Sequence, residues 1–229
     1  MNYKLILFDA DGTLFDYKKA EEDAFLKTFS RFNVNQNIEA FHRKYQKINL
    51  AIWKEFEEKK ITSKKLRVER FRRLFLQEKL SLDPEEISPV YLKYLSRGTH
   101  LLDGAEDIVK YFYGKCEIAL ATNGLSDVQY PRIQNSGLAK YFKHIFISEE
   151  IGFPKPDRKY FEHIFQKLTF RDSSIIVGDN LYSDIKGGSD FGIDTCWFNS
   201  GKRINESGVI PTFEISDLVE LKKIINRGD

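Results

Sequence analysis

Two aspartates, Asp9 and Asp11, lie two positions apart directly after the apolar run at residues 5–8. That run predicts a buried strand, and Gly12 lets the backbone turn back after the acids. Two like charges this close repel each other, and partial burial raises the cost unless a cation neutralises them. The segment therefore indicates a cation-binding site. Taken alone, it leaves open the alternative of an aspartate-rich turn without chemistry.

Three more polar clusters each follow an apolar run that predicts a strand. They are Thr122-Asn123-Gly124, Pro154-Lys155-Pro156-Asp157, and Gly178-Asp179-Asn180 with Ser183 and Asp184. Parallel strands bring their carboxyl ends to one edge of a sheet, where α/β proteins bind their ligands. We therefore expect one site that contains acids, a hydroxyl with adjacent backbone amides, and a lysine. Taken singly, each cluster also fits a turn, a solvated lysine or an acid at a helix start.

The elements that position these clusters alternate between strands and helices. Apolar runs predict strands at residues 5–8, 117–121, 144–147, 174–177, 195–198 and 212–215. Helical stretches separate them near residues 105–113, 126–136, 157–168, 183–191 and 216–226. This alternation is typical of a parallel α/β sheet with helices on both faces. Asp157 is expected to cap the helix that begins beside it.

Residues 17–95 interrupt this pattern with a helical, highly charged segment. Apolar residues at helical spacing predict four helices, the last after Asp83-Pro84, where Asp83 can cap and Pro84 suits the first turn. We predict that residues 17–95 form an inserted helical domain over the strand ends, and that residues 1–16 and 96–229 form the α/β core. The segment has 18 lysines and arginines against 12 acids. We interpret most of these charges as solvated helix faces and a smaller share as attracting an anionic substrate.

Composition narrows the class of protein. With 229 residues, 41% of them hydrophobic, the chain can bury a real core, which excludes wholesale disorder. Its net charge of +2 argues against a dedicated nucleic-acid binder. Cys116 and Cys196 are far apart beside predicted strands, so we expect both to be buried and reduced, as in a cytoplasmic protein. We expect no signal peptide and no membrane span, because no apolar run is long enough for a span.

Together, the four clusters resemble the motifs of the haloacid dehalogenase superfamily. Asp-x-Asp-Gly-Thr-Leu, Thr-Asn-Gly, Lys-Pro-Asp and Gly-Asp-Asn-x-x-Ser-Asp occur here in that family's order, type and spacing. The resemblance implies a Rossmann-like α/β core with an inserted helical cap and a magnesium-dependent enzyme. Dehalogenase relatives lack an acid at the position of Asp11, because a halide leaves without a proton. The acid therefore points to phosphoryl transfer, which a phosphatase and a phosphomutase share.

The resemblance also implies a role for each matching residue. Asp9 would attack phosphorus to form an aspartyl-phosphate, and Asp11 would protonate the leaving oxygen and then deprotonate water. Mg²⁺ would bind the Asp9 carboxylate, the Asp11 backbone carbonyl and Asp179. Lys155 would pair with Asp9 and with the phosphoryl group. Asp184 would act behind these ligands or through a metal-bound water.

The second of the four motifs, Thr-Asn-Gly, would bind the phosphoryl oxygens, and the cap would bind the rest of the substrate. The Thr122 hydroxyl and the Asn123 amide, with Gly124, would bind the phosphoryl oxygens. The cap is similar, at residues 49–53 and 61–63, to bacterial pyrimidine 5′-nucleotidases of the superfamily's first subfamily. Three segments of the core are similar to the same enzymes: the Thr-Asn-Gly motif with Gln129 and Arg132 downstream, residues 147–152 and residues 195–199. This similarity implies that nucleoside 5′-monophosphates, including those with non-standard pyrimidines, are the substrates.

Two cap residues are candidates for substrate contact. Asn49 is predicted to contact the substrate. Trp53 is able to stack on a base, although a tryptophan in the core of the cap is the simpler interpretation.

Other functions remain open on the sequence alone. One is a phosphatase for a sugar phosphate or phosphoglycolate, and another is a phosphomutase or a binding protein that has lost turnover. The basic residues 64–73 suggest nucleic-acid binding, but Glu69 and the apolar spacing favour an ordinary amphipathic helix. We therefore expect Mg²⁺, a small phosphorylated metabolite as partner, no nucleic acid, no membrane, and a monomer or homodimer.

Overall fold

A parallel sheet of six strands forms the centre of the molecule. The structure, a computed structural model, describes residues 2–34 and 37–226. Within them the strand order is β3-β2-β1-β4-β5-β6, and every neighbouring pair is parallel. The strands are β1 (Leu5–Phe8), β2 (Glu117–Thr122), β3 (His144–Ile147), β4 (Ser174–Gly178), β5 (Asp194–Phe198) and β6 (Phe213–Ile215). The predicted Rossmann-like α/β fold is confirmed.

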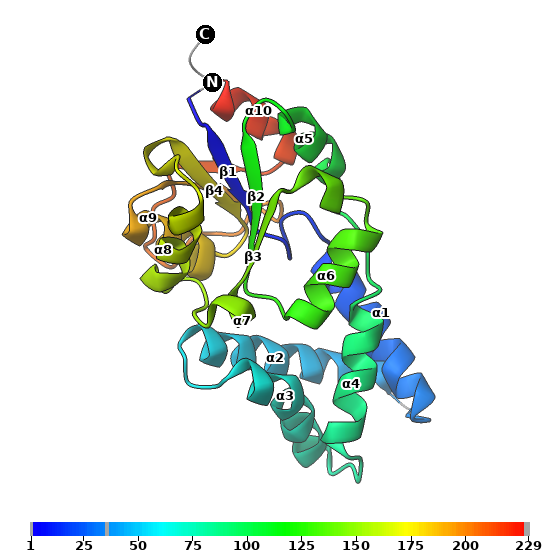
Figure 1. Ribbon diagram of the computed structural model, residues 1–229. Helices are drawn as coiled ribbons and strands as arrows, with labels where there is room; N and C mark the ends of the chain where they lie inside the picture. The colour runs from blue at the N-terminus through cyan, green and yellow to red at the C-terminus, as the bar shows by residue number, and fades with distance from the viewer. Residues whose placement is uncertain (1, 35–36, 227–229) are drawn as a thin grey trace.

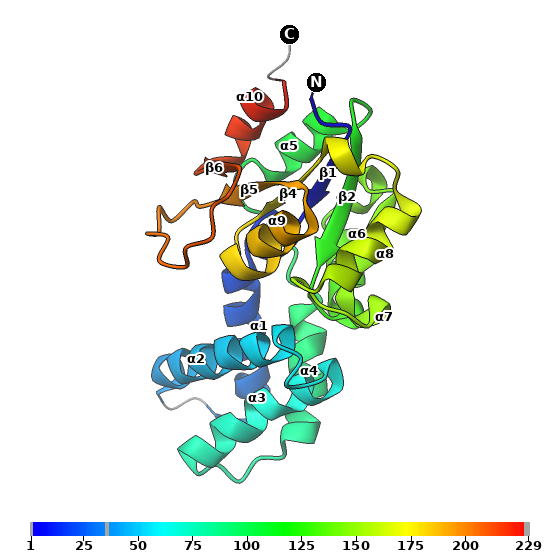
Figure 2. The same cartoon turned by 90° about the vertical axis from the view of Figure 1, so that its left-hand side faces the viewer.

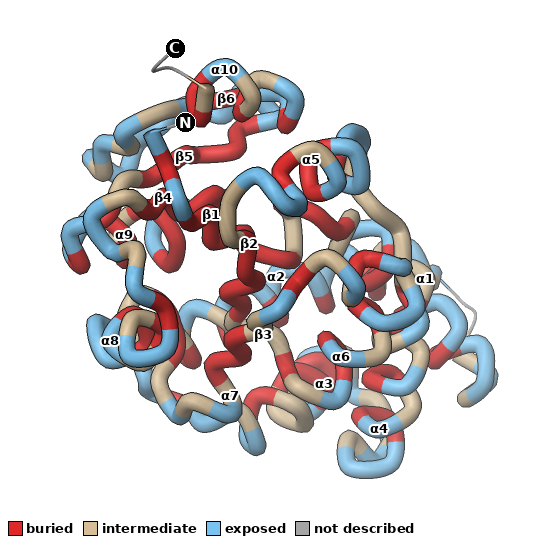
Figure 3. Tube along the Cα trace, turned by 45° about the horizontal axis from the view of Figure 1, so that its top comes forward, coloured by how far each residue is buried: buried red, intermediate tan, exposed pale blue. Residues whose placement is uncertain are grey.

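Helices cover both faces of this sheet (Figures 1 and 2). One face, which includes Ile6 and Phe8, packs against α5 (Ala105–Phe112), α6 (Ser126–Asn135) and α10 (Leu221–Ile225). The other face, with Leu5 and Leu7, packs against α8 (Arg158–Lys167) and α9 (Gly187–Phe191). The central strands are therefore buried along their length (Figure 3). Burial on both faces explains why these strands are continuous apolar runs.

Two predicted helices differ from the structure. Residues 183–191 were predicted as one helix, but a π-helical turn at Leu181–Lys186 precedes α9. In this turn the Ile185 amide donates to the Asn180 carbonyl, five residues earlier. The Asn180 side chain caps its start by accepting hydrogen bonds from the backbone amides of Tyr182 and Ser183. Residues 216–226 form a 3₁₀ turn at Leu218–Glu220 before α10, with a capping box at Asp217. Short 3₁₀ turns also occupy Ala139–Tyr141 and Arg171–Ser173, and α7 (Ser148–Ile151) follows β3 directly.

The described part of residues 17–95 forms four helices beyond the carboxyl ends of the strands (Figures 1 and 2). They are α1 (Tyr17–Arg31), α2 (Ile38–Glu57), α3 (Ser63–Glu78) and α4 (Pro84–Leu95). The Asp83 side chain accepts a hydrogen bond from the Glu85 amide and caps α4, as predicted. The four helices share a hydrophobic cluster of their own, which Leu125 and Val128 also join. We call residues 17–95 the cap and the remaining residues the core, and their division into two domains stays a proposal that this separate cluster supports.

Ion pairs join the cap to the core at the strand ends. Arg67 of α3 binds two core acids, Asp127 at 2.7 Å and Glu149 at 2.9 Å. Lys59, just after α2, forms an ion pair with Asp157, which also caps α8 as predicted. These ion pairs therefore hold the cap next to the carboxyl ends of the strands, where the polar clusters lie.

The two cysteines differ in burial. Cys116 and Cys196 are both free thiols, but only Cys196 is fully buried. The prediction that Cys116 is buried is wrong, because it lies in the turn before β2 and not within the strand.

Among the described helices, none has the length and apolar character needed to span a membrane.

Candidate active site

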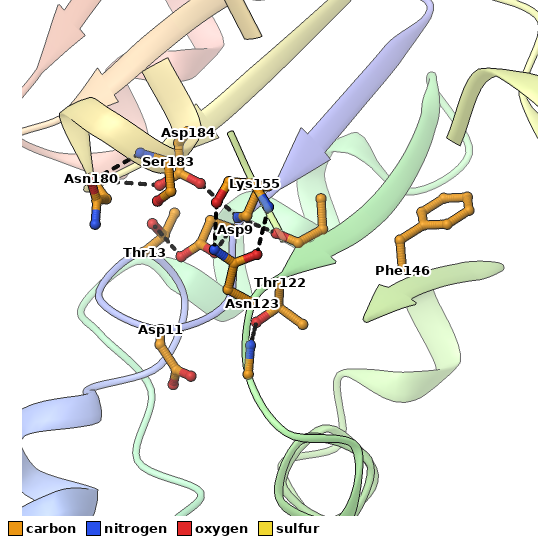
Figure 4. Close-up of polar contacts among 12 residues, drawn as sticks. Asp9, Asp11, Thr13, Thr122, Asn123, Phe146, Lys155, Asn180, Ser183 and Asp184 are labelled. Carbon is orange, nitrogen blue, oxygen red and sulfur yellow. Dashed lines mark hydrogen bonds and ion pairs between the residues drawn. The ribbon is translucent and has the colours of Figure 1, made fainter. Parts of the chain in front are cut away.

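The polar clusters predicted from the sequence lie together at the carboxyl ends of β1, β2 and β4 (Figure 4). Carboxylate oxygens of Asp9, Asp179 and Asp184 all lie within 4.8 Å of one another. The loop after β1 packs tightly against Asp179. A Cβ added to Gly12, whose φ is +85°, would lie 2.7 Å from the Asp179 Cγ. A glycine is therefore required where this loop turns.

Lys155 lies at the centre of the cluster, and its side chain is 1% exposed. Its Nζ donates hydrogen bonds to Asp9 Oδ1 at 2.8 Å and to Asp184 Oδ1 at 2.6 Å. It also donates to the carbonyl oxygen of Ala121 at 2.6 Å. A buried ammonium group needs such partners, and two of them are carboxylates. Lys155 therefore neutralises part of the acidic cluster from within.

The Asn123 side chain fixes the loop that carries Lys155. Its Oδ1 accepts from the Lys155 backbone amide at 2.8 Å, and its Nδ2 donates to the Lys155 carbonyl at 3.0 Å. The side-chain amide of Asn123 therefore binds the loop that carries Lys155. We still propose that the backbone amide of Asn123 donates to a phosphoryl oxygen.

The Thr122 hydroxyl is oriented for donation. Its Oγ1 accepts hydrogen bonds from the Gly124 amide at 3.0 Å and from Gln129 Nε2 at 3.3 Å. Because the oxygen accepts both bonds, its proton remains available for an anionic oxygen. Gly124 leaves space for this arrangement, since an added Cβ would lie 2.0 Å from Gln129 Nε2.

Both oxygens of Asp184 already have protein partners. Oδ1 accepts from Lys155, and Oδ2 accepts from the Asn180 backbone amide at 3.1 Å. Gly178 packs against this carboxylate so closely that an added Cβ would lie 2.3 Å from it. These contacts favour the predicted role of Asp184 behind the direct metal ligands.

The site carries an excess of buried negative charge. Burial raises the pKa of Asp9 well above its usual value, and the charges of Asp184 and Asp179 add to this effect against the lowering effect of Lys155. Burial, together with the charge of Asp184, raises the pKa of Asp179 to about 7. A cluster of oxygen ligands with surplus negative charge fits a hard divalent cation such as Mg²⁺. Asp9, Asp179 and the Asp11 backbone carbonyl would hold it.

We expect Mg²⁺ to raise the melting temperature more at about pH 8 than at about pH 6. A carboxyl group with a raised pKa binds protons more tightly in the folded state. The stability that protonation of Asp179 contributes is therefore lost as the pH rises through about 7. Mg²⁺ must displace these protons at the lower pH, but it binds free carboxylates at the higher pH. Thermal unfolding with and without Mg²⁺ measures the difference. Equal shifts at both pH values would contradict the assignment, and Asp179→Asn is expected to shrink the shift at the higher pH.

The Asp11 carboxylate is turned away from Asp9 and belongs to a separate set of contacts (Figure 4). Arg132 Nη1 donates to Asp11 Oδ1 at 2.5 Å, and Gln129 Nε2 donates to Asp11 Oδ2 at 2.6 Å. The Asp11 side chain is 24% exposed, whereas that of Arg132 is completely buried. The structure therefore separates this carboxylate from the three acids that surround Lys155.

Comparison with known proteins identifies the family to which the chain belongs. The family model described as "Hydrolase: haloacid dehalogenase-like hydrolase" matches residues 3–192. The chain belongs to the haloacid dehalogenase-like hydrolases.

Three relatives cover nearly the whole of this hydrolase. The pyrimidine 5′-nucleotidase PynA of Streptococcus pneumoniae is 34% identical over 100% of this chain and 97% of its own. The pyrimidine 5′-nucleotidase YjjG of Escherichia coli is 33% identical over 98% of this chain and 99% of its own. The solved structure of the putative HAD-hydrolase YfnB of Bacillus subtilis, described as bound to magnesium, has a TM-score of 0.91 and 36% identity. It covers 98% of this chain and 99% of that chain.

Sequence reasoning missed Glu57, the last residue of α2 in the hydrolase. Its Oε1 accepts a hydrogen bond from Asn123 Nδ2 at 3.3 Å, so a cap carboxylate reaches the second motif. Burial, together with the charge of Asp184, raises the pKa of Glu57 to about 7. Glu57 stands among other acids of a charged helix, so nothing in the sequence distinguishes it. The sequence also predicts no role for Thr13, which lies within the first motif. Its hydroxyl donates to Asp9 Oδ2 at 3.4 Å.

The two cap candidates have partners within the cap. Asn49 is buried, its Nδ2 donates to the Tyr17 hydroxyl at 3.1 Å, and its Oδ1 accepts from Arg70 at 3.3 Å. Trp53 is partly buried in the cap cluster, with its ring 5.7 Å from that of Phe56. This packing agrees with the simpler interpretation of Trp53. Contact of either residue with substrate stays a prediction.

Proposed function

We propose that this hydrolase is a magnesium-dependent phosphatase of nucleoside 5′-monophosphates, including those with standard and non-standard pyrimidines. The observation that carries the proposal is the buried contact of Lys155 with Asp9, with Asp179 close enough to contribute to the same site. The names of PynA and YjjG, similar over their whole lengths, support the substrate class.

The proposed reaction begins at Asp9. Its carboxylate attacks phosphorus and forms an aspartyl-phosphate while the bond to the leaving oxygen breaks. Lys155 reduces the repulsion between this carboxylate and the incoming phosphate, and the Thr122 hydroxyl donates to a phosphoryl oxygen. Mg²⁺, when bound, offsets the charge that develops on the phosphoryl oxygens.

Asp11 completes both halves of the reaction. It gives a proton to the leaving oxygen in the first half and takes one from the attacking water in the second. Water then breaks the bond between phosphorus and Asp9 and releases inorganic phosphate. The same residues would serve a phosphomutase until the second half, where the acceptor is a sugar hydroxyl in place of water.

A panel of phosphate esters with added Mg²⁺ tests the proposal. It contains pyrimidine and purine nucleoside 5′-monophosphates, sugar phosphates, phosphoglycolate and p-nitrophenyl phosphate. We expect pyrimidine nucleotides to have the highest kcat/KM. The nucleotidase assignment would fail if no nucleotide ranked among the better substrates, and a sugar phosphate or phosphoglycolate at the top would identify the substrate class instead. Isomerised sugar phosphate in place of inorganic phosphate would identify a mutase.

Replacement of Asn49 is expected to weaken nucleotide binding selectively. Asn49 is held by Tyr17 and Arg70 in the cap helices above the strand ends, so its amide is already oriented. We expect Asn49→Ala to raise KM for a nucleotide about 10-fold, the cost of one hydrogen bond, and to leave p-nitrophenyl phosphate hydrolysis nearly unchanged. Steady-state kinetics on both substrates measure the effect. The control is Asn205→Ala, at an exposed position of the α/β core and outside the cap. An equal change on both substrates would exclude a contact with the nucleoside.

A further inference from the structure

The Asp11 carboxylate is clamped by two side chains of one helix. Arg132 and Gln129, three residues apart on α6, each donate to a different oxygen of this carboxylate, at 2.5 Å and 2.6 Å. Both donors are completely buried. Because each oxygen has its own donor, the plane of the carboxylate is fixed, and a rotation would break at least one bond.

Arg132 is itself anchored to both connections between the core and the cap. Its Nε donates to the Gly98 carbonyl at 2.9 Å, in the segment that follows α4. Its guanidinium lies 4.8 Å from the centre of the Phe15 ring, in the segment that precedes α1. The side chain that orients Asp11 is therefore fixed by the two segments through which any cap movement must pass.

Gln129 connects the same carboxylate to the second motif. Its Nε2 donates to Asp11 and also to Thr122 Oγ1 at 3.3 Å. One amide group thus sets the positions of the proposed acid and of the hydroxyl proposed to bind phosphoryl oxygens.

The contacts with Gly98 and Phe15 give Arg132 a structural role, but this role alone does not require the pair with Asp11. A completely buried guanidinium is costly, and pairing with a carboxylate offsets the cost only where both groups are well bonded. Among the described ion pairs, the carboxylate that Arg132 binds is that of Asp11, which is itself partly exposed at the site. Apolar residues at these positions of α6 would give the helix a simpler core.

We propose that Gln129 and Arg132 are positioning residues that aim the Asp11 carboxylate at the leaving oxygen. The attacking and leaving oxygens lie on opposite sides of phosphorus, so the acid must act on the side away from Asp9. The Asp11 carboxylate is indeed turned away from Asp9 (Figure 4). The inference rests on the proposed function, in which Asp11 gives its proton to the leaving oxygen as the bond to phosphorus breaks.

The dependence of rate on the leaving group tests this inference. A nucleoside 5′-oxygen leaves as a strongly basic alkoxide and needs a proton, whereas p-nitrophenolate leaves without one. The parameter to compare is kcat/KM, because it reports the steps up to the first irreversible one and excludes hydrolysis of the aspartyl-phosphate. The variants are Arg132→Met and Gln129→Glu, and the second changes a donor into an acceptor with almost no change in shape.

We expect Arg132→Met to lose about 100-fold or more in kcat/KM on the best alkyl phosphate of the panel and less than about 5-fold on p-nitrophenyl phosphate. Because Gln129 also bonds the Thr122 hydroxyl, we expect Gln129→Glu to lose activity on both substrates, but at least about 10-fold more on the alkyl phosphate. Arg132→Lys, which keeps the charge, is expected to recover part of the loss. Combining Arg132→Met with Asp11→Ala is expected to be no worse than Asp11→Ala alone, since the arginine acts through that carboxylate. Gln134→Glu, an exposed residue of the same helix, is the control.

Two outcomes overturn the inference. Equal losses on the two substrates in the Arg132 variants would indicate a purely structural role, and unchanged kinetics in these variants would exclude any role. If Arg132→Met does not fold, Arg132→Lys decides, because Arg132 bonds Asp11 without contacting Thr122: a loss confined to the alkyl phosphate supports the inference, and an equal loss overturns it. Failure of the proposed function looks different, because it shows in the wild-type enzyme: either no nucleotide ranks among its better substrates, or it hydrolyses none of the phosphate esters.

Discussion

An Asp9→Asn variant is expected to lose at least about 10⁴-fold in kcat on every phosphate ester while keeping its fold. The asparagine amide matches the carboxylate in shape, but it cannot attack phosphorus to form the covalent intermediate. Lys155 would keep its bonds to Asp184 and to the Ala121 carbonyl, so the loop that carries it stays in place.

The variant is also expected to be at least as stable as the wild type when Mg²⁺ is absent. Burial raises the pKa of Asp9, which means that its charge is unfavourable in the folded protein. Removing that charge relieves repulsion among the three acids of the site. A gain in stability together with a loss of turnover is the usual sign of a residue kept for catalysis.

Steady-state assays and mass spectrometry after acid quenching measure these effects. The wild type is expected to carry one phosphoryl group on the peptide that contains Asp9, and the variant to carry none. Asp190→Asn is the control, because Asp190 is an exposed acid that forms a surface ion pair with Lys186. Turnover by Asp9→Asn within about 10-fold of the wild type would exclude Asp9 as the nucleophile.

The strands could be predicted from the sequence because the sheet is covered on both faces. Each strand from β1 to β5 contains a short apolar run between turn signals, and β1 and β3 have the predicted bounds. The other four strands differ from the prediction by one residue at one end. Parallel topology then brings the clusters together, since it places the carboxyl ends of β1, β2 and β4 side by side.

The contacts that orient the site could not be predicted in this way. Asn123 binds the loop of Lys155 across 32 positions and meets Glu57 across 66, and Gln129 binds Asp11 across 118. Apolar periodicity predicts which face of a helix is buried. It does not predict which polar residue at a helix end meets a distant loop, because that depends on how the helices sit on the sheet.

Lys155→Met is expected to destabilise the metal-free protein by about 3–5 kcal/mol, the cost of removing one partner from a buried ion pair. Burial alone would lower the pKa of Lys155. The charges of Asp184 and Asp9 outweigh this effect and raise the pKa above its usual value, so the side chain stays charged. Its loss would leave two buried carboxylates without a cation between them. Turnover is expected to fall about 100-fold or more, because we propose that the same ammonium group stabilises the reacting phosphoryl group.

A second substitution separates this electrostatic effect from lost packing. In the wild-type background, Asp184→Asn removes the carboxylate that binds both Lys155 and the Asn180 amide, and it is expected to destabilise the protein. In the Lys155→Met background, the same change removes one of two repelling carboxylates and is expected to stabilise it. Urea unfolding in the presence of a chelator measures all four proteins of this cycle. Destabilisation by Asp184→Asn in both backgrounds, to the same extent, would show that the two side chains are not coupled. A change of sign would show that the charge balance around the proposed nucleophile, Asp9, also stabilises the loops at the strand ends.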